Sequence, residues 1–233
     1  MSVDQVDPCR LRLNGAELLA EANGVLLWPE HHALVVADLH LEKGSSFATR
    51  GIFLPPYDTR ATLERLAAIA ARHAVRRIIC LGDSFHDRDA AERLDDDDAQ
   101  CLKRLTAATD WIWIAGNHDP LPPAHLGGRA VAGELRLGPL AFRHVASCAA
   151  NPGEISGHFH PKASLDVRGR RLTGRCFVSD EHRLVMPAFG AYAGGLDVFD
   201  PALRVLFPGD FMVHLLARGR IAALPQARLA GAI

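Results

Sequence analysis

The chain has 233 residues, of which 48% are hydrophobic and 23% are charged, with a formal net charge of −1. This length suffices for a large buried core, and we expect residues 1–233 to form a single domain. The near-neutral charge excludes a global field that attracts nucleic acid or an anionic membrane, so any contact with DNA must depend on a local patch. Five widely spaced cysteines without a Cys-x-x-Cys pair indicate reduced thiols and a cytoplasmic protein.

Short strand-like segments open the chain. Residues 10–13 alternate polar and apolar side chains, and residues 24–28 are mostly apolar. We expect them to form an edge hairpin or two short edge strands. Residues 33–37 are apolar on both faces, which is typical of a central strand that other elements cover on both sides.

Polar side chains follow this central strand at once. Asp38 and His40 are separated by a single residue, and in an extended chain residues i and i+2 point the same way. The two side chains are therefore predicted to converge as half of a metal site. The alternative is a turn aspartate beside a surface histidine.

Residues 42–56 are rich in Gly, Ser and Pro and are predicted to be a loop that forms one wall of the pocket. Lys43 and Arg50 in this loop are candidates to contact a substrate phosphate, with ordinary surface charges as the alternative. Apolar residues at helical spacing then predict a helix over residues 57–73.

A second buried strand over residues 77–81 leads into Gly82 and Asp83. Strand, helix and strand in succession predict a βαβ unit with parallel strands, whose carboxyl ends lie at one edge of the sheet. Asp83 is therefore expected beside Asp38, where its two oxygens can bridge two metals. His86 is a candidate for the pocket rim, or else a surface histidine.

Residues 89–107 have a helical pattern, and the four carboxylates at 95–98 are predicted to be a solvated helix surface, because consecutive helix residues do not share a face. A third strand over residues 111–115 leads into Gly-Asn-His-Asp. Here Asn117 offers a neutral oxygen ligand, His118 offers a metal ligand or a proton donor, and Asp119 can orient the imidazole. An ordinary turn is the alternative.

From about residue 130 short strands replace the alternation of strand and helix. Residues 134–137 and 140–144 predict a hairpin with His144 at its end. A strand over residues 153–157 then delivers His158 and His160, which are predicted to share a face by the same i, i+2 rule and to form a second half of a metal site.

The last part of the chain is predicted to contain strands over residues 176–178 and 183–186, and a final hairpin of residues 203–207 with 211–216. The arginines at 168–175 form the densest basic cluster. They are either a solvated hairpin turn around Gly169 or a set of phosphate contacts.

Oxygen and imidazole ligands without a thiolate suit Mn, Fe or Zn. The strand ends together supply too many such side chains for one metal. Two metals about 3.5–4 Å apart are the usual clamp for in-line displacement at phosphorus. The candidates are Asp38, His40, Asp83, Asn117, His118, His144, His158 and His160.

The order of these motifs resembles the calcineurin-like metallophosphoesterase superfamily. Asp-x-His, Gly-Asp, Gly-Asn-His-Asp, a lone His and Gly-His-x-His follow one another over residues 38–160. Residues 41–45, 54–59 and 187–192 are further similar to the bacterial ligase-associated DNA damage response endonucleases, the PdeM-like family. The resemblance implies a four-layer α/β/β/α sandwich with two mixed sheets.

The resemblance also implies roles. The first metal is held by Asp38, His40 and His160. The second metal is held by Asn117, His144 and His158. Asp83 bridges the two, and a metal-bridging hydroxide attacks phosphorus. His118 protonates the leaving oxygen or steadies the phosphoryl charge, with Asp119 orienting it. Lys43, Arg50 and His86 are the candidate substrate-binding residues.

The leading hypothesis is therefore a dinuclear phosphodiesterase or nuclease linked to DNA repair. Its metals are expected to be two divalent ions, Mn before Fe or Zn. The family implies DNA as a substrate and DNA ligase, nuclease or helicase proteins as partners, and no membrane partner is expected. One alternative is a small-molecule phosphoesterase, such as a nucleotide-sugar pyrophosphohydrolase or a cyclic nucleotide phosphodiesterase. The other is a non-catalytic metal-bound scaffold for repair proteins.

Overall fold

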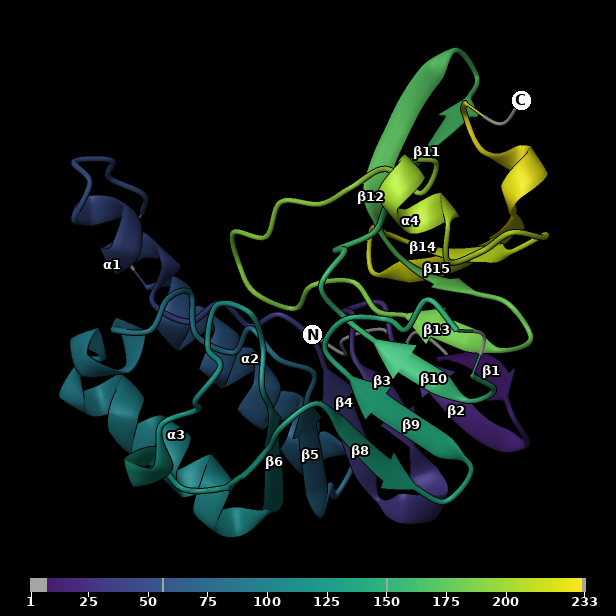
Figure 1. Ribbon diagram of the computed structural model, residues 1–233. Helices are drawn as coiled ribbons and strands as arrows, with labels where there is room; N and C mark the ends of the chain where they lie inside the picture. Colours follow the sequence, from purple (N-terminus) through teal and green to yellow (C-terminus); the bar gives the residue numbers. More distant parts are fainter. Residues whose placement is uncertain (1–7, 56, 150, 232–233) are drawn as a thin grey trace.

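Two mixed β-sheets packed face to face form the centre of the computed structural model, which describes residues 8–55, 57–149 and 151–231 (Figure 1). Helices cover the outer face of the first sheet, and a short helix with loops lies against the second. This is the α/β fold with two mixed sheets that the resemblance implies. None of the described helices has the length and apolar composition needed to cross a membrane.

The first sheet has seven strands in the order β1-β2-β3-β4-β5-β6-β7. Strands β1 to β4 pair antiparallel and strands β4 to β7 pair parallel. The bounds are β1 (Cys9–Leu13), β2 (Ala16–Ala20), β3 (Leu26–Trp28), β4 (Ala33–Val36), β5 (Arg77–Cys80), β6 (Asp110–Ile114) and β7 (Arg129–Val131). The parallel run from β4 to β6 confirms the predicted βαβ unit and brings the ends of these strands to one edge.

Alternate residues of the central strands pack on opposite faces of the first sheet. Val35 and Ile79 belong to the core between the two sheets. Leu34 and Ile78 belong to the core under the helices α2 (Asp58–Arg72) and α3 (Asp96–Ala108). All four side chains are fully buried, and each burial stabilises the fold by about 1.5–3 kcal/mol. Burial on both faces confirms that the predicted central strand is central.

The second sheet has the order β15-β14-β12-β13-β10-β9-β8, and β11 pairs with β12 beside this path. The bounds are β8 (Glu134–Leu137), β9 (Leu140–Arg143), β10 (Glu154–Ser156), β11 (Lys162–Val167), β12 (Arg170–Ser179), β13 (Arg183–Val185), β14 (Met212–Ala217) and β15 (Arg220–Pro225). Phe177 packs between the sheets, whereas its neighbours Cys176 and Val178 pack under α4 (Pro201–Arg204) and the adjoining loops. The outermost layer on this side therefore consists of one short helix and loops.

Three predicted elements differ from the structure. The first hairpin joins β1 to β2 through Asn14-Gly15, and residues 26–28 instead form an interior strand that pairs with β2 and β4. The predicted loop 42–56 contains the helix α1 (Lys43–Ala48), and Pro56 lies outside the described residues. The predicted final hairpin is wrong, because residues 201–204 are helical and β14 pairs with β15. The apolar residues within 203–207 are as typical of a buried helix end as of a strand.

The predicted helix over residues 89–107 divides in two. A 3₁₀ helix, η2 (Ala90–Arg93), precedes α3, and further 3₁₀ helices are η1 (Pro29–His31), η3 (Ala124–Leu126) and η4 (Gln226–Arg228). Asp95 caps α3 by accepting the backbone N–H of Asp98 at 2.8 Å. The solvated-surface prediction fits the exposed Asp96 but is wrong for Asp98, which is buried and pairs with Arg60 at 3.0 Å.

Candidate metal centre

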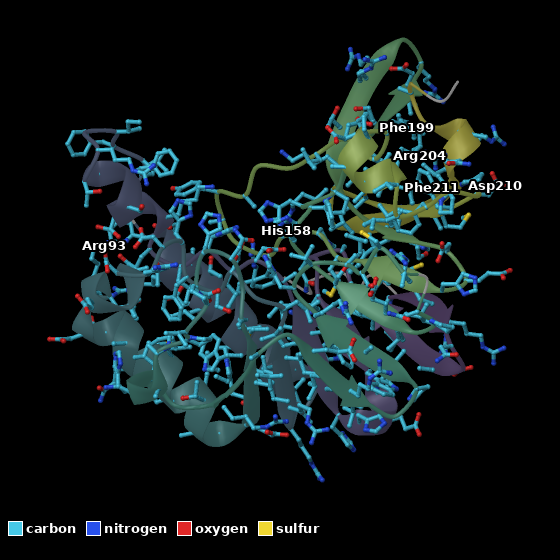
Figure 2. All side chains as sticks on the ribbon, in the orientation of Figure 1. Arg93, His158, Phe199, Arg204, Asp210 and Phe211 are labelled. Atoms are coloured by element: carbon cyan, nitrogen blue, oxygen red, sulfur yellow. The ribbon has the colours of Figure 1, made fainter. Side chains whose placement is uncertain are left out.

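The candidate ligands lie on loops that follow five strands of the two sheets. Loops after β4, β5 and β6 carry Asp38, Asp83 and Asn117, and loops after β9 and β10 carry His144 and His158. Figure 2 labels His158 near the middle of the view. Two carboxylates of the centre are almost fully buried, with Asp38 0% and Asp83 2% exposed. Buried carboxylates need compensating positive charge.

The first set of converging ligands consists of Asp38, His40 and His160, and we name it the Asp38 group. One ligand atom from each lies within 4.8 Å of the others. The Nε2 atoms of His40 and His160 are 3.3 Å apart, and Nε2 of His160 is 3.4 Å from Oδ1 of Asp38. Two ring nitrogens that face each other cannot both donate, whereas a cation between them satisfies both lone pairs. The three side chains therefore fit a metal ion.

The second set consists of Asp83, Asn117, His144 and His158, and we name it the Asp83 group. Ligand atoms of Asp83, His144 and His158 lie within 4.8 Å of one another. Nε2 of His144 is 2.8 Å from Oδ1 of Asn117, 3.2 Å from Nδ1 of His158 and 3.3 Å from Oδ2 of Asp83. Four polar atoms of different residues thus surround one point.

The main chain sets the tautomer of His144. Its Nδ1 lies 2.8 Å from the carbonyl oxygen of Leu81. Because a carbonyl only accepts, Nδ1 carries the proton and donates it, which leaves the Nε2 lone pair free for a cation. Such a bond also fixes the ring plane, so His144 needs little reordering to bind a metal.

Charge in the centre favours a bound cation. Burial lowers the pKa of His40 to about 3, and the charge of His160 adds to this effect. Burial acts to raise the pKa of Asp83, but the hydrogen bonds and charges of His144 and His118 together outweigh this and hold the pKa at about 2. Burial also opposes charging of His144, yet the carboxylates of Asp83 and Asp38 raise its pKa. Low pKa values thus favour the carboxylate of Asp83 and the neutral imidazole of His40, the forms that coordinate metals, and the raised pKa of His144 shows that the carboxylates favour positive charge beside them.

The backbone of the centre differs from the predicted one. The extended conformation expected for Asp38-x-His40 and His158-x-His160 is wrong, although both pairs do converge. Five ligand residues have left-handed backbone angles: Asp38 (φ 53°), His40 (45°), Asp83 (46°), His158 (70°) and His160 (47°). This conformation is rare outside glycine and costs on the order of 1–3 kcal/mol per residue. Strain of this kind clusters at functional sites.

Glycines of the motifs allow the close packing of these loops. Gly82 has φ +75°, and a Cβ built there would lie 2.6 Å from the ring of His144. A Cβ on Gly116 would collide with the backbone nitrogen and a carboxylate oxygen of Asp83. The glycines of Gly-Asp and Gly-Asn-His-Asp are therefore needed because no side chain fits.

His118 is held by the main chain of His86. Nδ1 of His118 lies 2.7 Å from the carbonyl oxygen of His86, and the backbone N–H of His118 donates to Oδ1 of Asp83 at 2.9 Å. Its Nε2 lies 3.9 Å from Oδ2 of Asp83, so the free edge of the ring faces the metal ligands.

Asp119 contacts a different part of the centre from the one expected. Its Oδ2 accepts the backbone N–H groups of Ser84 at 2.8 Å and Phe85 at 3.1 Å, and its Oδ1 accepts that of Gly116 at 3.2 Å. Burial, its largest cause, raises the pKa of Asp119 to about 7. Asp119 therefore fixes the loop after Asp83, while a carbonyl orients His118. A main-chain carbonyl carries no signal in a sequence, so this partner could not be found there.

The three candidate substrate contacts lie at different depths. The ring of His86 lies 5.4 Å from the rings of both His40 and His118, and the three histidines offer ligand atoms within 4.8 Å of one another. Burial lowers the pKa of His86 to about 4, with Lys43 as the next cause. Lys43 is half-buried on α1, and Arg50 is exposed after it. The structure thus brings His86 into the centre and leaves Arg50 at the surface.

The arginine cluster near the end of β11 divides into two kinds. Arg168, Arg170 and Arg171 are exposed at the β11–β12 hairpin, which projects from the second sheet in Figure 1. Arg175 is half-buried and donates to the carbonyl of Ala188 at 2.6 Å. The solvated-hairpin interpretation fits the first three residues but not Arg175.

A family model described as calcineurin-like phosphoesterase matches residues 31–171. The chain belongs to the calcineurin-like phosphoesterase family. It is therefore a metal-dependent phosphoesterase, and the matched residues contain every ligand of the Asp38 and Asp83 groups. A comparison of this phosphoesterase with curated protein sequences gives no match.

Among solved structures, the phosphoesterase is similar to Pseudomonas putida nuclease MPE, with a TM-score of 0.75 and 30% identity. This match covers 94% of the present chain and 100% of MPE, and it is consistent with the PdeM-like resemblance. Yfce, a phosphoesterase from E. coli, has a TM-score of 0.44 and 14% identity over 82% of this chain and 97% of its own.

Proposed function

We propose that this phosphoesterase is a nuclease linked to DNA repair that cleaves phosphodiester bonds with two divalent metal ions. The observation that supports this most is the presence of two ligand groups in one centre. The Asp38 group and the Asp83 group each gather carboxylate and imidazole atoms within 4.8 Å. His160 and His158, two residues apart in the chain, belong to different groups, which favours two adjacent ions.

In this proposal each group holds one metal and Asp83 is shared between them. When bound, the two metals supply a water of lowered pKa and neutralise charge on the phosphoryl group. Manganese is the proposed metal, with iron and zinc compatible with the same ligands. The protein contributes preorganised ligands, because the bond from His144 to Leu81 and the burial of Asp38 hold them in place.

His118 is the proposed proton donor to the leaving oxygen. Its Nδ1 proton is engaged by the carbonyl of His86, so Nε2 is the atom that carries and releases a second proton. Asp119 supports this geometry through the loop that contains Ser84 and Phe85. Lys43, Arg50 and His86 are proposed to contact the substrate beside this proton donor.

DNA is the proposed substrate because the similar protein MPE is a nuclease. Repair proteins such as DNA ligase are proposed partners, and the cytoplasm is the proposed compartment. A small-molecule phosphodiester is the second candidate, and the net charge of −1 favours it, because a polyanion is usually bound by a basic surface.

The test is hydrolysis of bis-p-nitrophenyl phosphate, p-nitrophenyl phosphate and a labelled DNA oligonucleotide, with Mn²⁺ added or chelated. We expect metal-dependent cleavage of the diester and of DNA, and loss of both in Asp83→Ala. Asp96→Ala is the matched control, because Asp96 is exposed on α3. Cleavage of the small diester without DNA favours the second candidate. Absence of metal-dependent turnover of all three esters contradicts the proposal.

A further inference from the structure

Two arginines hold the segment that follows β13. Arg65 of α2 donates to the carbonyl oxygen of Phe189, and its guanidinium lies 3.9 Å from the centre of the Phe189 ring. Arg175 of β12 donates to the carbonyl oxygen of Ala188 at 2.6 Å. Figure 1 shows the segment between β13 and α4 leaving the second sheet toward the helical side before it returns. Arg65 reaches this segment from the helical layer on the first sheet, and Arg175 reaches it from the second sheet.

This placement is electrostatically costly. Both guanidinium groups are half-buried, and within the described residues neither forms an ion pair with a carboxylate. Burial, followed by the charge of Arg175, lowers the pKa of Arg65 to about 10, and burial also lowers the pKa of Arg175. Guanidinium groups nevertheless stay charged at neutral pH. Buried cations without a counterion persist only where other contacts compensate. Here the compensation comes from carbonyl oxygens and an aromatic face.

The opposite edge of the same segment binds the loop that carries Asp38. The backbone N–H of Phe189 donates to the carbonyl of Ala37 at 2.8 Å, and that of Gly190 donates to the carbonyl of Asp38 at 3.1 Å. A Cβ on Gly190 would collide with the carbonyl of Leu39. Ala188 and Phe189 are fully buried. The segment is therefore pressed directly against the left-handed backbone of the Asp38 group.

We propose that Arg65 and Arg175 are positioning residues for the metal ion of the Asp38 group: they fix the carbonyls of Ala188 and Phe189, so that the N–H groups of this segment hold the strained Asp38–His40 turn. The inference rests on the proposed two-metal centre. It also gives a physical role to residues 187–192, whose resemblance to the PdeM-like family is otherwise unexplained.

The effect is expected to be larger at one of the two metals than at the other. The Asp83 group has its own supports, since Leu81 holds His144 and the backbone of His118 holds Asp83. No hydrogen bond among the described residues joins residues 187–190 to a member of the Asp83 group. The two groups still touch, because the backbone N–H of His40 donates to the carbonyl of Asp83 at 2.9 Å and that of His158 donates to the carboxylate of Asp38 at 3.0 Å. Loss of either arginine should therefore weaken binding of the Asp38-group metal more than binding of the other.

The test is calorimetric titration of metal-free protein with Mn²⁺. Wild type should bind two equivalents, and His160→Ala and His158→Ala identify the equivalent that belongs to each group. In Arg65→Met and Arg175→Met we expect the affinity for the Asp38-group equivalent to fall about 10–100-fold, with a smaller fall for the other equivalent. Arg175→Lys keeps one donor toward Ala188 and should recover part of the loss.

The matched controls are Arg72→Met on α2 and Arg171→Met on β12, because both arginines are exposed on the same elements. They should leave both affinities unchanged. If a Met variant does not fold, the corresponding Lys variant must still weaken the Asp38-group equivalent more than the other. Equal weakening of both equivalents, or no change in either, overturns the inference. Fewer than two equivalents in wild type contradicts the proposed function itself, before any arginine is changed.

Discussion

The two ligand groups of the centre are built from similar side chains but are held in different ways. All three residues of the Asp38 group have left-handed backbone angles, and the turn that carries Asp38 and His40 is held both by the loop after β5 and by the segment after β13. In the Asp83 group two of four residues have such angles, and the carbonyl of Leu81, two residues before Asp83, fixes His144. The Asp38 group thus has a support, the segment after β13, that within the described residues forms no hydrogen bond with the Asp83 group. Distant substitutions should therefore separate the two groups.

The largest effect is expected where the groups meet. Asp83→Ala should lower turnover of bis-p-nitrophenyl phosphate by about 10³-fold or more, because a shared carboxylate contributes several kcal/mol to metal binding and charge neutralisation. Metal content, measured by mass spectrometry after gel filtration, should fall for both groups. If the Asp38 group keeps its metal with unchanged affinity, Asp83 does not join the two groups.

The next largest effect concerns His118, which we assign to chemistry rather than to either group. His118→Ala should lower turnover by about 10²–10⁴-fold, the usual range for a positioned general acid, while metal content stays at the wild-type level. The loss should be greater for DNA than for the p-nitrophenyl diester, because p-nitrophenolate leaves without a proton. His125→Ala is the control, since His125 is exposed. Equal losses on both esters would rule out proton donation.

His214 is a buried histidine that belongs to neither ligand group. Its titration shows how acid affects the stability of the fold apart from the metal centre. Burial lowers the pKa of His214 to about 4, from an ordinary value of 6.5. Between these pH values His214 binds a proton in the unfolded chain but stays neutral in the folded chain. Stability therefore falls as pH falls from about 6.5 to about 4, by at most about 3 kcal/mol.

Urea unfolding of metal-free protein at pH 7 and pH 4 measures this loss. His214→Gln should lose less stability between the two pH values than wild type, and the loss that remains belongs to other groups such as His40. Equal losses in the two proteins would show that His214 titrates normally.

The smallest effect compares two glycines with nearly the same backbone angle. Gly82 (φ +75°) packs against His144, whereas Gly169 (φ +76°) has open space around it. Gly169→Ala measures the cost of the angle alone, and Gly82→Ala adds a collision, which should cost about 1–3 kcal/mol more in the free energy of unfolding. Similar values for both variants would show that the ring of His144 moves aside at little cost in stability.

Much of the fold and the centre could be predicted because local pattern and chemistry agree along the chain. Strands β4, β5 and β6 are apolar on both faces and each ends in a ligand, so their parallel order places Asp38, Asp83 and Asn117 at one edge. The final hairpin was predicted wrongly, because apolar residues near 203–207 suit a strand or a buried helix equally well. Helix α1 was missed because Gly and Ser favour loops in isolation.

The sequence by itself determined the sheet type, the ligand types and the strand ends that carry them, since these depend on periodicity and side-chain chemistry within a few residues. Only the tertiary structure decided how the ligands are held. Three features depend on residues that are distant in the chain. They are the left-handed backbone at Asp38, the hydrogen bond from His118 to the carbonyl of His86, and the hydrogen bonds from Arg65 and Arg175 to the carbonyls of Phe189 and Ala188. Main-chain groups carry the same atoms at every position, so only folding decides which of them meet.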